Sequence, residues 1–91
     1  MRIISNPEEV RKMDITARKF IAEAVGMFNF NNLTEYNMSI VPKTKKSFTM
    51  HILDSSRAIV SIEEFSAANL KSPSGTFKVA RLINWIHLIN M

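Results

Sequence analysis

Three lysines crowd the short segment Lys43-Thr44-Lys45-Lys46. Side chains so close in sequence cannot all pair with nearby acids, so we expect them to project into solvent as a cationic finger. Ammonium groups presented in this way suit contacts with phosphate oxygens. The same segment also suits a solvated turn that keeps an edge strand from pairing with another chain. Both interpretations stay open on the sequence alone.

A second group of cations lies near the end of the chain, beside the single tryptophan. On a helix, which turns about 100° per residue, Lys78, Arg81 and Trp85 fall within roughly 60° of one another. An exposed aromatic ring beside cations is typical of base stacking or of a protein-binding hot spot. A tryptophan lying across the rim of a sheet is the structural alternative. Lys71 precedes this helix, where a helix N-terminus favours a phosphate.

The sequence contains none of the arrangements of cysteine, histidine or paired carboxylates that most enzymes use for catalysis. There is no cysteine, so thiolate catalysis and cysteine-based metal sites are excluded. His51 and His87 have no partner at the spacing of a metal site, and we expect both on the surface. Glu63 and Glu64 are adjacent, so their side chains diverge and cannot act as a carboxylate pair. We expect a protein that is not an enzyme and holds neither a metal nor a cofactor.

The positive charge is concentrated in one half of the 91 residues. Residues 1–41 contain five basic and five acidic side chains, whereas residues 42–91 contain seven basic and three acidic ones. The whole formal charge of +4 therefore arises in the second half, which suits a polyanion-binding surface. A charge of this size also suits ordinary solubility. The residues predicted to contact nucleic acid are Lys43, Lys45, Lys46, Lys71, Lys78, Arg81 and Trp85.

The first third of the chain predicts one long amphipathic helix. Asn6 is a favourable N-cap, Pro7 suits the first helical position, and two acids follow. The helix is expected to run to about Met27, with Gly26 as its cap. Its apolar stripe comprises Val10, Met13, Ala17, Phe20, Ile21, Ala24 and Phe28. Residues 2–5 are expected to form a short strand or an extended lead-in.

Three segments with alternating apolar residues follow, at residues 35–41, 47–53 and 57–62. The short turns between them predict a three-stranded antiparallel meander with one buried face. The residues predicted to share a face are Tyr36, Met38 and Ile40 in the first segment and Phe48, Met50 and Ile52 in the second. Ser61-Ile62-Glu63-Glu64 matches a capping box, so we favour a short helix from Ser61 to Leu70 over an extension of the third strand to Phe65.

The last helix is expected from Phe77 to about Asn90, with Ser74 or Thr76 as its N-cap. The residues predicted to face the sheet are Val79, Leu82, Ile83, Ile86 and Ile89. Trp85 and Leu88 fall outside this arc, so a second apolar patch is expected on the helix surface. Such a patch often marks a partner surface.

Together these elements predict a single α+β domain over residues 1–91, with one or two C-terminal helices on the sheet. The order of a long helix, a three-stranded meander and a terminal helix resembles that of the double-stranded-RNA-binding domain. The resemblance implies phosphate contacts by the lysine-rich turn and by Lys78 and Arg81. The family's basic run at the start of the last helix is replaced here by residues 72–76, Ser-Pro-Ser-Gly-Thr.

Two functions remain open at this point. The first is a small, non-enzymatic regulator that binds DNA or RNA through the basic second half. The second is a protein-interaction module, an inhibitor or adaptor that uses the C-terminal helix and is expected to form a homodimer. No apolar run long enough to span a membrane occurs and the N-terminus does not resemble a secretory signal, so we expect a cytoplasmic protein without a membrane partner.

Overall fold

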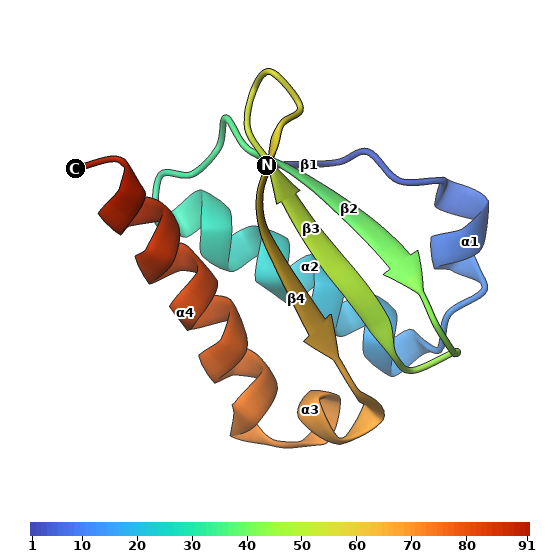
Figure 1. Ribbon diagram of the computed structural model, residues 1–91. Helices are drawn as coiled ribbons and strands as arrows, with labels where there is room; N and C mark the ends of the chain where they lie inside the picture. The colour runs from blue at the N-terminus through green and yellow to red at the C-terminus, as the bar shows by residue number, and fades with distance from the viewer.

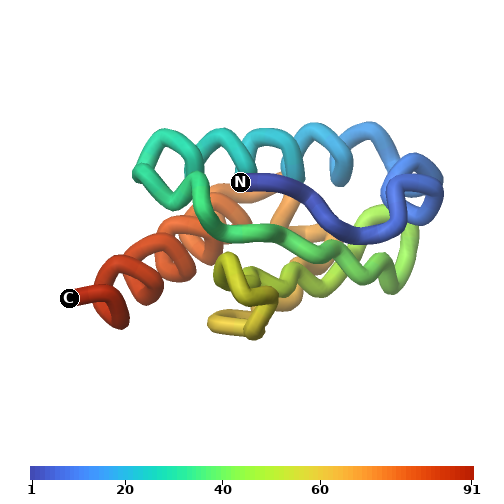
Figure 2. The backbone as a smooth tube through the Cα atoms, turned by 90° about the horizontal axis from the view of Figure 1, so that it is seen from above, coloured from blue at the N-terminus to red at the C-terminus, as the bar shows by residue number.

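Helices cover one face of a four-stranded sheet in the computed structural model, which describes residues 1–91 (Figure 1). The elements in chain order are β1 (Arg2–Ile3), α1 (Pro7–Arg11), α2 (Ile15–Phe30), β2 (Asn37–Pro42), β3 (Phe48–Leu53), β4 (Ile59–Phe65), α3 (Ala67–Lys71) and α4 (Pro73–Ile89). Viewed from above, α2 runs along one side of the strands, and the red end of α4 slants away at the left (Figure 2). The α+β class predicted from the sequence is confirmed.

The predicted antiparallel meander is confirmed in part: β2, β3 and β4 form it within a mixed sheet of four strands, and the predicted face of β2 and β3 is buried. β2 pairs with β3 and β3 with β4, with Ile40 opposite Met50 and Met38 opposite Ile52. These four side chains are fully buried, because alternate residues of a strand point to the same face. The sheet has one strand more than predicted. β1 pairs with β2 in parallel, and the Ile4 N–H donates to the Met38 carbonyl at 2.9 Å.

The expected single N-terminal helix is wrong: the structure divides it into α1 and α2. Asn6 caps α1 as predicted, but Asp14 caps a second helix by accepting a 2.8 Å hydrogen bond from the Thr16 N–H. The Asp14 N–H donates across the molecule to the Lys45 carbonyl at 2.8 Å, so it is not part of a continuous helix. Gly26 lies inside α2, which continues to Phe30 and has Asn31 as its C-cap.

The favoured helix from Ser61 is also wrong, and the alternative extension of the third strand to Phe65 is correct. Phe65 pairs with Phe48 across the strands, and their rings stack with centroids 5.2 Å apart. This buried aromatic contact outweighs the local capping pattern. A shorter helix, α3, begins after Ser66, whose hydroxyl accepts from the Asn69 N–H at 3.4 Å.

The last helix begins four residues earlier than predicted. Ser72 is its N-cap instead of Ser74 or Thr76, and Pro73 occupies the first helical position. Val79, Leu82, Ile83 and Ile86 are buried as expected, whereas Ile89 is 45% exposed because the last turn extends beyond the core. None of the helices combines the length and the hydropathy that crossing a bilayer requires.

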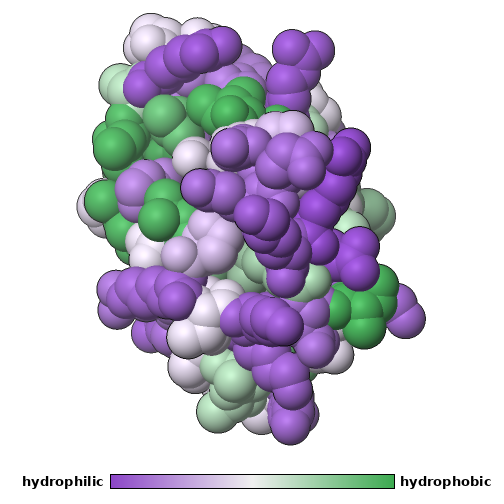
Figure 3. All heavy atoms as spheres, turned by 90° about the vertical axis from the view of Figure 1, so that its right-hand side faces the viewer, coloured by the Kyte–Doolittle hydropathy of each residue, from purple (hydrophilic) through white to green (hydrophobic).

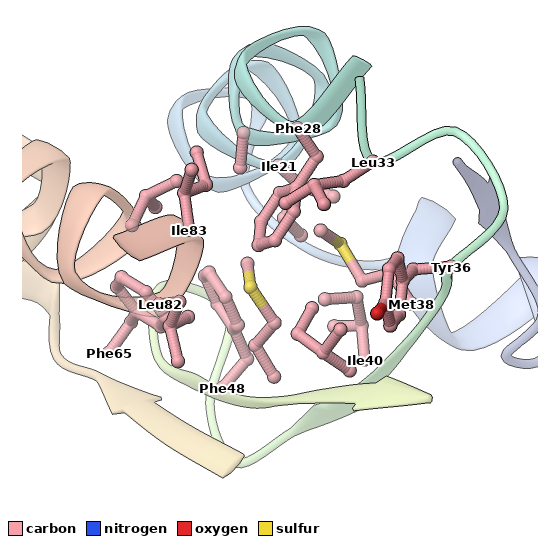
Figure 4. Packing of buried hydrophobic residues seen from close by; sticks show 14 of the residues in the cluster. Ile21, Phe28, Leu33, Tyr36, Met38, Ile40, Phe48, Phe65, Leu82 and Ile83 are labelled. Carbon is pink, nitrogen blue, oxygen red and sulfur yellow. The ribbon is translucent and has the colours of Figure 1, made fainter. Parts of the chain in front are cut away.

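The core lies between the sheet and the two long helices, α2 and α4. Figure 4 shows side chains from β2, β3, α2 and α4 meeting in this layer. Gly75, in the first turn of α4, is buried where α3 and α2 come close. A Cβ at this position would lie 2.4 Å from the Asn69 carbonyl oxygen and 2.9 Å from Cε2 of Phe20. The close approach of these elements therefore depends on a residue without a side chain.

This packing predicts opposite effects for the two glycines of the chain. Gly75→Ala is expected to lower the free energy of unfolding by about 1–3 kcal/mol, because a backbone carbonyl has to move. Gly26→Ala is the matched control: apart from the neighbouring backbone of its own helix, no atom lies within 4 Å of its Cβ position. Alanine in a helix is favoured over glycine by up to about 1 kcal/mol. Urea unfolding of both variants measures the difference. Equal effects of the two substitutions would contradict the proposed packing.

Candidate functional site

The seven predicted site residues fall into two separate places. Lys43, Lys45 and Lys46 lie on the turn between β2 and β3, and Lys78 lies close to that turn through a shared partner, Glu64. Arg81 and Trp85 lie further along α4, on its outer side. Lys71 is the exposed last residue of α3 and makes neither an ion pair nor a side-chain hydrogen bond. The structure thus brings four of the seven together.

The lysine-rich turn is held by its own hydrogen bonds. The Lys43 N–H donates to the Ser47 carbonyl at 2.9 Å, and the Thr44 hydroxyl accepts from the N–H groups of Lys46 and Ser47. The side chains of Lys45 and Lys46 make no ion pair. Their ammonium groups are therefore presented to solvent from a defined backbone.

Glu64, in β4, joins the turn to α4. The Lys43 ammonium donates to its carboxylate at 2.5 Å, and the Lys78 ammonium donates to its backbone carbonyl at 2.6 Å. Lys78 also lies 5.6 Å above the Phe65 ring centroid, within range of a cation–π contact. The hydrogen bond and charge of Lys43, with a smaller contribution from Lys78, lower the pKa of the Glu64 carboxyl below its ordinary 4.5. Two of the predicted cations are thus partly neutralised.

Two further cations at this end were missed by the sequence analysis. Lys12 lies beside Lys43 and Lys45 around a shallow depression of about 410 Å³. Arg18 and Lys46 both act on Asp14, whose pKa is lowered chiefly by hydrogen bonds from Thr16 and further by these two charges. Lys12 and Arg18 belong to the first half of the chain, where the charges sum to zero.

We call this surface the cationic end; it comprises Lys12, Arg18, Lys43, Lys45, Lys46 and Lys78. A second depression, of about 340 Å³, continues it from Lys43 past Glu64 to Lys78. Figure 3 shows the side of the molecule with α1 and this turn, where long hydrophilic side chains cover most of the surface. The neighbouring carboxylates are Glu9, Asp14 and Glu64. Six cations against three acids leave a surplus of three, most of the formal charge of +4.

The outer side of α4 has a different character. Arg81 lies 3.6 Å from the Glu63 carboxylate, and its side chain is 73% exposed. Trp85 is 49% exposed and lies one helical turn beyond Arg81, on the side away from the β2–β3 turn. Phe77, which the sequence analysis did not select, lies one turn before Arg81 and is exposed. The predicted stacking residue is therefore not part of the cationic end.

Comparison of the chain with protein-family models, curated proteins and solved structures finds no significant match. Within the structure, no group of three or more His, Cys, Asp or Glu side chains is placed to hold a metal ion.

The contact between Lys43 and Glu64 predicts a measurable change in titration. Lys43→Met is expected to raise the pKa of Glu64 towards 4.5, because the main cause of its depression is removed. Lys78→Met should raise it less, since Lys78 acts on the carboxylate only through its charge. Asp54 is an internal reference: its pKa is lowered by Ser56 and Ala58 and should not change. Carboxyl NMR titration measures all three values.

The same contact fixes the sign of a pH effect. A carboxylate with a lowered pKa in the folded state adds stability above its unfolded pKa, and this contribution is lost as the pH falls through the folded value. Wild type should therefore exceed Lys43→Met in stability at neutral pH and lose that advantage in acid. A wild-type Glu64 that titrates at 4.5 would contradict the contact.

Proposed function

We propose that this protein is a small, non-enzymatic regulator that binds nucleic acid through the cationic end. The observation that carries the proposal is the convergence of cations from four parts of the chain: the α1–α2 junction, the first turn of α2, the β2–β3 turn and α4. Neutralisation of phosphates by such side chains supplies most of the non-specific affinity of proteins for nucleic acid. The proposal places the protein in the cytoplasm and leaves both DNA and RNA as ligands.

The nearby carboxylates decide which cations contribute most. Lys43 and Lys78 hold Glu64, so their charge is partly cancelled before a ligand arrives. Lys45 and Lys46 have no ion pair. The Lys46 N–H donates to the Thr44 hydroxyl, and the Lys45 carbonyl accepts from the Asp14 N–H. A phosphate that approaches the turn therefore meets these two ammonium groups first. We assign them the largest share of the binding energy.

The type of cation favours contacts with the phosphate backbone of a nucleic acid over base-specific recognition. Five of the six side chains of the cationic end are lysines, which act as flexible point charges. Sequence reading in grooves relies more on bidentate side chains such as arginine, asparagine and glutamine. We therefore expect binding that depends on phosphate spacing and salt and that shows little preference for sequence.

Titration with labelled duplex DNA, duplex RNA and single strands tests the proposal. If four cations meet phosphates, the logarithm of the affinity should fall with the logarithm of salt concentration with a slope of roughly −3 to −4. Lys45→Gln/Lys46→Gln should make that slope shallower by roughly 2 units, because two phosphate contacts are lost.

The matched control removes the same charge at the other end of the sheet. Arg2→Gln/Arg57→Gln changes one residue of β1 and one of the β3–β4 turn, both distant from the lysines along the strands (Figure 1). This variant should retain the wild-type slope. An equal loss in both double variants would show that only net charge matters, and an affinity independent of salt would refute the proposed site.

A further inference from the structure

An exposed apolar stripe runs along α4, on the side that faces away from the core. Phe77, Trp85 and Leu88 are 65%, 49% and 60% exposed. At about 100° per residue these three side chains and Arg81 lie within roughly 80° of the helix circumference, with Arg81 between Leu88 and Trp85. We call these four residues the α4 stripe. Large apolar side chains grouped in this way usually mark a partner surface.

The charges of α4 are all of one sign. Its sequence from Pro73 to Ile89 contains Lys78 and Arg81 and no aspartate or glutamate. The Arg81 guanidinium meets one carboxylate, that of Glu63, at 3.6 Å, and its side chain remains largely exposed. The pair is long and only its arginine is largely exposed, since the Glu63 side chain is 27% exposed. The Arg81 guanidinium therefore keeps donors available for a second carboxylate.

We infer that the α4 stripe docks an acidic amphipathic helix of a partner protein. The apolar side of that helix would cover Phe77, Trp85 and Leu88, and a carboxylate from it would join Glu63 at Arg81. Aromatic side chains and arginine at the centre of a patch are the combination that dominates binding energy at protein interfaces. From Phe77 to Leu88 the stripe is roughly 17 Å long, which matches about three turns of a partner helix.

The position of Arg81 favours a protein over a lipid surface. Helices that lie on membranes keep their cations on the polar face and bury the apolar one among the acyl chains. In α4 the guanidinium lies inside the apolar stripe, so acyl chains that cover the stripe would have to desolvate it together with Glu63. A protein helix offers a carboxylate at that point.

The charge also argues against a second copy of this chain. A two-fold contact places the same patch on both sides of the interface. Two α4 stripes would bring Arg81 and Lys78 of both copies together, and the one carboxylate beside each stripe, that of Glu63, is already paired with Arg81. Like charges across an interface cost several kcal/mol. A complementary acidic helix removes this cost.

Trp85 supplies a direct measurement, because the chain has a single tryptophan. The probe is a synthetic peptide of about 18 residues, long enough for helix formation, with leucines at helical spacing and glutamates on the remaining positions. It carries no tryptophan, and its control has lysine in place of every glutamate. The acidic peptide should shift the Trp85 emission to the blue in a saturable titration, and the lysine peptide should bind at least about tenfold more weakly.

Charge reversal at Arg81 tests the assigned contact. Arg81→Glu should invert the preference so that the lysine peptide binds more tightly, whereas Arg57→Glu, at the β3–β4 turn, should leave it unchanged. Leu88→Asp should weaken binding of the acidic peptide about tenfold or more. Because Arg81 and Leu88 are exposed, circular dichroism should show the native fold in both variants.

Three results would overturn the inference. The first is an unchanged Trp85 emission in the presence of the acidic peptide. The second is a blue shift that depends on protein concentration alone. The third is a stronger response to phosphatidylglycerol vesicles than to the peptide. The second result would indicate a homodimer and the third a membrane surface. Lys45→Gln/Lys46→Gln should leave the peptide affinity within about twofold of wild type, so failure here is distinct from failure of the nucleic-acid proposal.

Discussion

Three phenylalanines from distant parts of the chain join α2 to β3 and to the edge strand β4. Phe48 and Phe65 stack, and the Phe20 ring lies 5.3 Å from that of Phe65 by centroids. Aromatic pairs of this geometry add to the energy of burial and fix the positions of the elements that carry them. Phe20 also lies against Gly75, so the same contact sets how closely the start of α4 approaches.

The position of Phe65 determines the distribution of charge. Since β4 continues to this residue, Glu63 and Glu64 remain in the strand and face α4 and the β2–β3 turn instead of starting a helix. Each glutamate then meets a cation, Lys43 at Glu64 and Arg81 at Glu63. An uncharged end of β4 would have left all of these cations unpaired. The core contact therefore decides which charges are available to a ligand.

The parts that were predicted correctly depend on neighbours in sequence. Alternation of apolar residues placed Met38, Ile40 and Met50 in the core, because the two-residue period of a strand is local. The break before α2 was missed because Met13 and Ala17 keep helical spacing across it, while the Asp14 N–H finds its partner at Lys45, far along the chain. The capping pattern at Ser61 failed for the same reason: a contact between strands outweighed it.

The candidate site shows the same division between local and distant information. The lysine cluster of the turn is visible in the sequence, but its neighbours Lys12 and Arg18 are brought to it only by folding. Helical spacing grouped Lys78 with Arg81 and Trp85, yet folding gives the two cations different roles. Lys78 is held by the Glu64 carbonyl and the Phe65 ring, so it helps to fix α4 to the sheet. Arg81 has one long ion pair, to a Glu63 side chain that is 27% exposed. Its own side chain is 73% exposed, so Arg81 is the cation of α4 that a further carboxylate can reach.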